Sequence, residues 1–191
     1  MNKICALLLL SLSFSVSGCF FIAGAAAGAA AIAIVYDHRK FEKIIDDQHL
    51  SNSIADRIRS VPNLHTHSHI DVSCFNGIVL LTGETPNPAW REQAENIAKS
   101  IPGVVRIYNQ ITVEGPTSSL TRTSDAWITT KIKTQMLATE GLKSSSIKVV
   151  TENGVVYLMG IVTREQGNVA AELARQITGV LKVVKIFQYK D

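Results

Sequence analysis

The chain has 191 residues, with 19 basic side chains, 16 acidic side chains and a formal net charge of +3. This length allows one medium domain or two small ones. The basic side chains form no tract, so neither composition nor charge indicates a nucleic-acid partner.

The N-terminus has the order of a secretory signal. Lys3 gives a short positive region, and residues 4–16 are an almost uninterrupted apolar run, too short and wrongly flanked for a spanning helix. Residues 16–19 read VSGC and resemble the bacterial lipobox, whose cysteine is acylated and becomes the first residue of the mature protein. We therefore predict a signal peptide at residues 1–18 and lipidation of Cys19. The alternative is an ordinary signal peptide that is cut nearby.

The residue after Cys19 is Phe20 and not Asp. In lipoproteins of this kind an Asp at that place retains the protein in the inner membrane, so the resemblance implies the outer membrane, facing the periplasm. It also implies three acyl chains, palmitate among them. Since each buried methylene contributes about 0.8 kcal/mol, such an anchor would not release readily.

Processing would leave Cys74 as the single free thiol, because Cys5 leaves with the signal peptide and Cys19 is acylated. One thiol offers no intramolecular disulfide. Cys74 alternates with Ile70 and Val72, as the inward side chains of a strand do. We predict a buried core thiol, with an intermolecular bridge or a reactive thiol as the alternative.

The mature chain begins with a predicted tether, residues 19–47. Residues 20–35 are apolar, with Gly24 and Gly28 spaced for close helix packing. The run is short against the roughly 20 residues of a membrane span, so we expect a flexible or surface-lying segment, with a membrane-inserted helix as the alternative. Residues 36–47 mix both charge signs and are predicted to be a solvated spacer.

An internal repeat organises the rest of the chain. Residues 76–83 read NGIVLLTG and residues 153–160 read NGVVYLMG. Asn-Gly between apolar runs is a strong hairpin signal, because both central residues of a type I′ turn need positive φ. The other predicted elements recur in the same order in both copies: an opening helix marked by Leu50, Ile54 and Ile58 or by Ile128, Ile132 and Met136, a strand at 70–75 or 147–152, a helix at 89–100 or 164–177, and a last strand at 104–113 or 180–189.

The predicted fold class is therefore α+β, with two tandem α-β-β-α-β units. Each unit has a three-stranded mixed sheet with two helices on one face. The units span residues 48–114 and 124–191, and residues 115–123 form a linker. A unit of this size is near the limit at which a single core is stable.

The two NG-(I/V)-V-x-L-x-G hairpins, each followed by a helix and a glycine-valine entry to the last strand, resemble the BON domain (bacterial OsmY and nodulation). With the lipobox added, the chain resembles the dual BON-domain outer-membrane lipoproteins of Gram-negative bacteria, a lipid-binding type associated with division and outer-membrane stress. The resemblance implies a non-enzymatic protein that binds anionic phospholipid membranes through its second domain. It further implies a role in envelope integrity, partly at division sites, with outer-membrane or division-site envelope proteins as further partners.

The opening helix of the second copy carries the candidate lipid site. At 100° per residue, Trp127, Lys131 and Thr134 lie away from the apolar stripe of this helix, and Leu137 is within reach of them. An exposed Trp and Leu framed by lysines is the composition of a membrane-interface helix. The candidate phospholipid-binding residues are Trp127, Lys131, Lys133, Thr134 and Leu137. The alternative is that Trp127 packs between the two domains.

His65, His67 and His69 form an H-x-H-x-H run. On one face of a strand such residues can bind zinc or copper. Strand-alternate histidines rarely complete a tetrahedral site, and no Cys or carboxylate pattern accompanies them. We therefore interpret the run as a polar approach to the strand and predict no metal site.

No catalytic motif is recognisable, so we predict no enzyme, no catalytic residue and no cofactor. Asp125 is interpreted as the N-cap of a helix, or as close to it. Two alternatives to the lipid-binding lipoprotein stay open: a periplasmic scaffold that binds envelope proteins, and a small envelope hydrolase.

Overall fold

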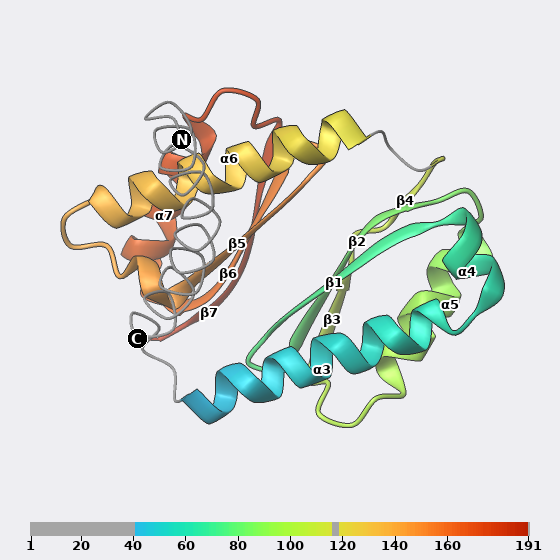
Figure 1. Ribbon diagram of the computed structural model, residues 1–191. Coiled ribbons are helices and arrows are strands. Elements are labelled where there is room, and N and C mark those ends of the chain that lie inside the picture. Colours follow the sequence, from blue (N-terminus) through green and yellow to red (C-terminus); the bar gives the residue numbers. More distant parts are fainter. Residues whose placement is uncertain (1–40, 116–118, 191) are drawn as a thin grey trace, which may run out of the picture. The chain divides into compact units, whose positions relative to one another are not determined.

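The computed structural model describes residues 41–115 and 119–190, and the signal peptide, Cys19 and the run 20–35 lie outside the described residues. The elements of the first copy are α3 (Phe41–Arg59), α4 (Pro62–His67), β1 (His69–Phe75), β2 (Ile78–Thr85), α5 (Pro88–Lys99), β3 (Arg106–Asn109) and β4 (Thr112–Val113) (Figure 1). Those of the second copy are α6 (Ser119–Ala138), η1 (Ser144–Ser146), β5 (Ile147–Glu152), β6 (Val155–Val162), α7 (Arg164–Arg175) and β7 (Lys182–Tyr189). Both copies belong to one compact unit, Arg39–Asp191.

The α+β architecture of two tandem units is confirmed. The strands have the order β1-β2-β3 in one sheet and β5-β6-β7 in the other, antiparallel within each hairpin and parallel to the last strand. Helices α3 and α5 pack on the first sheet, and α6 and α7 pack on the second. Each sheet is therefore mixed, with two helices over one face.

The last strand of the first copy is interrupted, which the sequence did not predict. Strands β3 and β4 both pair with β2, and two residues separate them. The side-chain oxygen of Asn109 accepts the backbone N–H of Ile111 at 3.2 Å. The N–H of Ile111 is therefore used in a local turn and is not available to pair with strand β2.

Both opening helices begin earlier than predicted. Helix α3 starts at Phe41, within the predicted spacer, and α6 starts at Ser119, within the predicted linker. Hydrophobic periodicity marks only the part of a helix that packs on the sheet, so the preceding turns were missed. Asp125 consequently lies inside α6, and its prediction as an N-cap is wrong.

The two Asn-Gly turns have the predicted conformation. Asn76 and Gly77 have φ of 52° and 74°, and Asn153 and Gly154 have φ of 49° and 72°. Positive φ at both central residues is what a type I′ turn requires. The hairpin of each copy is thus set by the same local chemistry.

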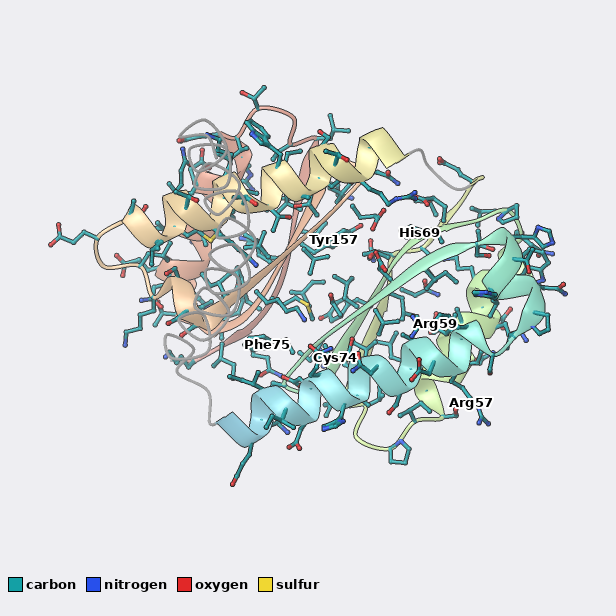
Figure 2. The ribbon with its side chains drawn as sticks, viewed as in Figure 1. Arg57, Arg59, His69, Cys74, Phe75 and Tyr157 are labelled. Atoms are coloured by element: carbon teal, nitrogen blue, oxygen red, sulfur yellow. The ribbon has the colours of Figure 1, made fainter. Side chains whose placement is uncertain are left out.

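The faces of the sheets that carry no helices pack against each other. All eight residues of β2 are buried: Val79 and Leu81 point to the helices, and Ile78 and Leu80 point to the opposite sheet. This inter-sheet core also contains other residues of both copies: Phe75, Tyr157, Met159 and Ile186, of which Phe75 and Tyr157 are labelled in Figure 2. Burying a side chain of this size contributes about 1.5–3 kcal/mol, so the shared core holds the copies together.

Hydrogen bonds between the copies border this core. The Asn76 amide donates to the side-chain oxygen of Gln188 at 2.8 Å. The Lys148 ammonium donates to the carbonyl oxygen of Cys74 at 3.1 Å. Such bonds satisfy polar groups that the packing of the sheets removes from water.

Candidate membrane-binding helix and the junction between the copies

Helix α6 turns one face to the core and the other to solvent. Ile128, Ile132 and Met136 are buried in the hydrophobic core of the second copy. They are spaced by four residues, so they form a single stripe along the helix. The predicted core stripe is therefore present.

The opposite face exposes two large apolar side chains. Trp127 is 49% exposed and Leu137 is 70% exposed. The Lys131 ammonium lies 5.5 Å from the centroid of the Trp127 ring, within reach of a cation–π interaction. Trp127 belongs to none of the buried cores, so the alternative that it packs between the domains does not describe this structure.

The polar candidates lie on the solvent side of the same helix. Lys133 and Thr134 are exposed. The Thr134 hydroxyl donates to the carbonyl oxygen of Thr130 at 2.9 Å, so its proton is used within the helix. Within residues 41–115 and 119–190, no helix has both the length and the apolar character needed to cross a membrane. An exposed apolar pair with adjacent lysines instead suits a helix that lies at a membrane surface.

An aspartate in each opening helix binds the hairpin turn of its own copy. The Asp125 carboxylate accepts the backbone N–H groups of Asn153 and Gly154, each at 2.8 Å. The Asp47 carboxylate accepts the equivalent N–H groups in the first copy at 2.7 and 3.0 Å. Asp125 precedes Trp127 by two residues, so this contact helps to orient the candidate surface.

Neither of these two aspartate contacts was predicted from the sequence. The separation from aspartate to asparagine is 29 residues in the first copy and 28 in the second. The signal available in the sequence was an aspartate 29 or 28 residues before the asparagine of each Asn-Gly turn.

The repeated unit matches a known family model. The BON domain model matches residues 46–115 and 124–191, which include both hairpins and the helices around them. The chain belongs to the BON domain family. The family resemblance stated from the sequence is therefore confirmed.

Three relatives resemble the chain over most of its length. The chain is 35% identical over 164 residues to the outer membrane lipoprotein DolP of Haemophilus influenzae, covering 86% of this chain and 85% of the relative. It is 37% identical over 153 residues to the 21 kDa hemolysin of Actinobacillus pleuropneumoniae, covering 80% and 79%. It is 26% identical over 147 residues to the osmotically-inducible protein Y of Escherichia coli, covering 75% and 73%. None of these names describes an enzyme.

The three histidines of the first BON domain do not share one strand face, as they would if the whole run were extended. His65 and His67 lie in α4, and only His69 lies in β1. The His67 ring stacks on Trp90 with centroids 5.9 Å apart. Pro62 begins this unpredicted helix at its first position, where proline is favoured.

Acidic side chains gather where the two BON domains meet. Glu152, at the end of β5, is buried, and burial raises the pKa of its carboxyl to about 7. The negative charges of Glu84, Asp71 and Asp125 raise this pKa further, while a hydrogen bond with Thr82 lowers it. Sequence reasoning missed this cluster because its members come from both domains.

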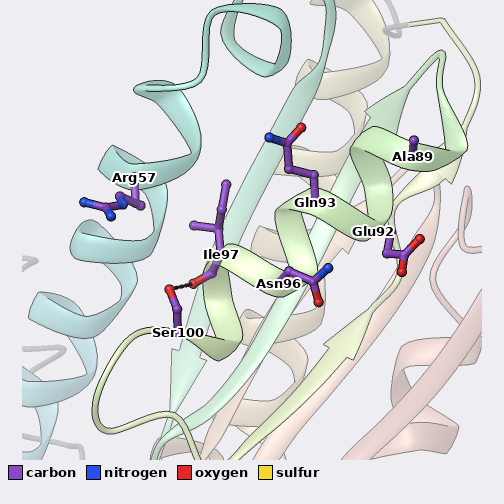
Figure 3. Close-up of a pocket in the computed structure, with 7 residues that line it drawn as sticks. All are labelled: Arg57, Ala89, Glu92, Gln93, Asn96, Ile97 and Ser100. Atoms are coloured by element: carbon purple, nitrogen blue, oxygen red, sulfur yellow. Dashed lines mark hydrogen bonds between the residues drawn. The ribbon is translucent and has the colours of Figure 1, made fainter.

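The surface of the described residues includes hollows in both BON domains. One, of about 320 Å³, is beside the acidic junction and is lined by Asp71, Arg122, Asp125, Ala126, Thr129, Thr151 and Glu152. Another, of about 490 Å³, is lined by Arg57, Ala89, Glu92, Gln93, Asn96, Ile97 and Ser100 (Figure 3). In the second hollow the Ser100 hydroxyl donates to the carbonyl oxygen of Ile97, so it is not paired with a base that could activate it.

Proposed function

We propose that this protein is a lipid-anchored envelope protein whose second BON domain binds anionic phospholipid surfaces through the exposed face of α6. One observation carries the proposal: Trp127 and Leu137 project from a helix whose other face is fully used by the core. Neither side chain contributes to folding through burial in the core. An interfacial role accounts for their exposure.

The charge of the two domains supports the second as the membrane-binding one. Residues 125–191 contain nine basic and six acidic side chains, whereas residues 48–114 contain five and six. The second domain thus has a net charge of +3 and the first of −1. A positive surface is attracted to anionic headgroups by about 1 kcal/mol for each lysine or arginine near them.

The envelope setting is supported by the relatives and by the N-terminus. The relative that is 35% identical is named an outer membrane lipoprotein. In the proposed arrangement, Cys19 carries the acyl chains in the outer membrane and the BON domains face the periplasm. There α6 binds anionic lipid and the protein supports envelope integrity, including at division sites.

Vesicle flotation of a fragment with residues 39–191 tests the lipid-binding step, because these residues form one compact unit. We expect the fragment to float with vesicles that contain anionic phospholipid and not with purely zwitterionic vesicles. Trp127→Glu should abolish flotation, since it removes apolar insertion and adds a charge that anionic headgroups repel. Lys131→Ala combined with Lys133→Ala should weaken binding roughly thirtyfold at low salt, from about 1 kcal/mol for each lysine.

Val105→Glu is the matched control, because Val105 is an exposed apolar side chain of the first domain. It adds the same charge and should leave flotation unchanged. Circular dichroism should show every variant folded. A folded Trp127→Glu variant that floats like wild type would refute the site. Absence of binding at every lipid composition would favour the envelope scaffold instead.

A further inference from the structure

Three side chains of types that can ligate a metal ion converge at the junction between the BON domains. His69 and Asp71 alternate along β1, so both point to the same side of the sheet. Glu152 reaches the same place from the second domain. One ligand atom from each of the three lies within 4.8 Å of the other two. A modest adjustment of side chains would let all three contact one ion.

The environment of the His69 ring independently indicates that this atom cluster could bind an ion. Its Nε2 atom is buried and, among the described residues, accepts or donates no hydrogen bond. The nearest carboxylate oxygen, on Asp71, is 3.5 Å away, too far for a good hydrogen bond. A buried polar atom without a partner costs about 1–3 kcal/mol. A bound cation would satisfy its lone pair.

The surroundings are acidic and partly removed from water. Glu84 is fully buried beside Glu152, and the Asn153 amide donates a hydrogen bond to it. The Glu152 carboxylate lies among the like charges of Glu84, Asp71 and Asp125, which repel it. A divalent ion between Asp71 and Glu152 would offset this repulsion.

The hollow of about 320 Å³ gives an ion a route to these residues. Asp71 and Glu152 both line it, so the cluster opens to solvent on one side. Arg122 also lines the hollow, and its positive charge would oppose the entry of a cation. With an ion bound to Asp71 and Glu152, the rest of the hollow would have room for one or more water molecules as further ligands.

We propose that His69, Asp71 and Glu152 bind a divalent transition-metal ion of the zinc class that links the two BON domains. One imidazole and two carboxylates provide three ligands, and water from the hollow can complete a tetrahedron. The imidazole favours zinc-like ions over calcium and magnesium, which prefer oxygen ligands. Because the ligands come from both domains, the ion would stabilise the junction.

Calorimetric titration of Zn²⁺ into the full-length lipoprotein, stripped with a chelator and held in detergent, tests the proposal. We expect one Zn²⁺ ion per chain at this site, and much weaker binding of Mg²⁺. Removing a group that hydrogen-bonds to a metal ligand lowers metal affinity by roughly 10–100-fold. Removing a direct ligand should therefore lower the affinity for Zn²⁺ at least about tenfold. His69→Gln, Asp71→Asn and Glu152→Gln should each do so.

His65→Gln and His67→Gln are the matched controls, because they remove neighbouring imidazoles that lie outside the cluster. Both should bind Zn²⁺ like wild type. Zn²⁺ should also raise the melting temperature of wild type and of these controls, but not of the cluster variants. The Asp71 side chain is 64% exposed, so Asp71→Asn should fold normally and keep the test decisive. Wild type without Zn²⁺ binding, or binding retained in all three cluster variants, would overturn the proposal.

Discussion

The Asp125 carboxylate accepts the backbone N–H of Gly154 at 2.8 Å, and this contact ties helix α6 to the hairpin of its own domain. The same carboxylate also accepts the N–H of Asn153. The type I′ turn directs both N–H groups to one point, and a buried side chain on the helix meets them there. Asp47 makes the same contacts in the first domain.

Asp125→Ala should therefore destabilise the protein by about 2–4 kcal/mol, because it leaves two N–H groups without their charged acceptor. Asp47→Ala should have a comparable effect. Asp46→Ala is the control, since Asp46 is exposed on the same helix as Asp47 and its loss should change stability by no more than about 0.5 kcal/mol. Urea denaturation measures all three. Equal stability of Asp125→Ala and wild type would show that the contact contributes nothing.

Gly154→Val should destabilise the second domain by about 3 kcal/mol or more, because a β-branched residue combines the strain of positive φ with overpacking. A Cβ atom at this position would lie 3.0 Å from the carbonyl oxygen of Gly179 and 2.9 Å from Leu181 Cγ. The exposed leucine can move, but the backbone oxygen has less freedom.

Gly141→Val separates the two causes. Gly141 also has positive φ, at 78°, but a Cβ atom there would meet nothing within 4 Å. It should cost only the strain of the backbone, about 1–2 kcal/mol. If both variants lose the same stability by thermal unfolding, the close approach to Gly179 is unimportant.

Cys74 should resist alkylation in the folded protein. The thiol is buried, and burial raises its pKa to about 11, with the charge of Asp47 adding to the rise and that of Lys148 opposing it. At pH 8 only about 0.1% of such a thiol is thiolate, the reactive form. Iodoacetamide should modify Cys74 rapidly in concentrated urea and slowly in buffer, as mass spectrometry can show. Rapid modification of the native protein, or a disulfide-linked dimer, would contradict the buried core thiol.

Glu152→Gln should stabilise the metal-free protein at alkaline pH. The pKa of Glu152 is raised from 4.5 to about 7, so the folded state binds more protons than the unfolded state between these values. The free energy of unfolding of wild type should therefore fall as pH rises from about 4.5 to 7. Above pH 7 the ionisation of Glu152 should cause no further fall. At pH 8 the gain of the variant should reach up to about 3 kcal/mol, and near pH 4.5 it should be small.

Denaturation curves recorded in EDTA at both pH values measure this difference. Glu140→Gln, at an exposed position, removes the same formal charge and should give no comparable gain at pH 8. A Glu152→Gln variant less stable than wild type at pH 8 would mean that the ionised carboxylate is favourable where it lies.

Cys19→Ser should release the protein from the membrane fraction, because the proposed acyl chains are the main anchor. Fractionation followed by immunoblotting measures the distribution. A carbonate wash strips proteins that are held only at the surface. A variant that still pellets after this wash would favour insertion of residues 20–35.

Local chemistry made much of the fold predictable. The Asn-Gly turns, the strands beside them and the helices marked by periodic apolar residues follow from side chains close in sequence, and the repeat supplied each signal twice. Helical geometry placed Trp127 away from the core stripe of Ile128, Ile132 and Met136, but it left open whether Trp127 packs between the domains, and the structure shows it exposed. Family membership could be inferred because it rests on these same local patterns.

Only the tertiary structure decided what covers the second face of each sheet. Amphipathic periodicity shows that a face is buried but does not show which element covers it. Here Leu80 of the first sheet and Tyr157 of the second lie in one core between the two sheets. The contacts of Asp47 and Asp125 form because helices α3 and α6 extend N-terminally far enough to place these carboxylates beside the hairpin turns. His69 lies apart from His65 and His67 because those two residues are in helix α4. It lies close to Glu152 because the two domains pack face to face. These contacts join residues distant in sequence, so the packing of the two domains determines them.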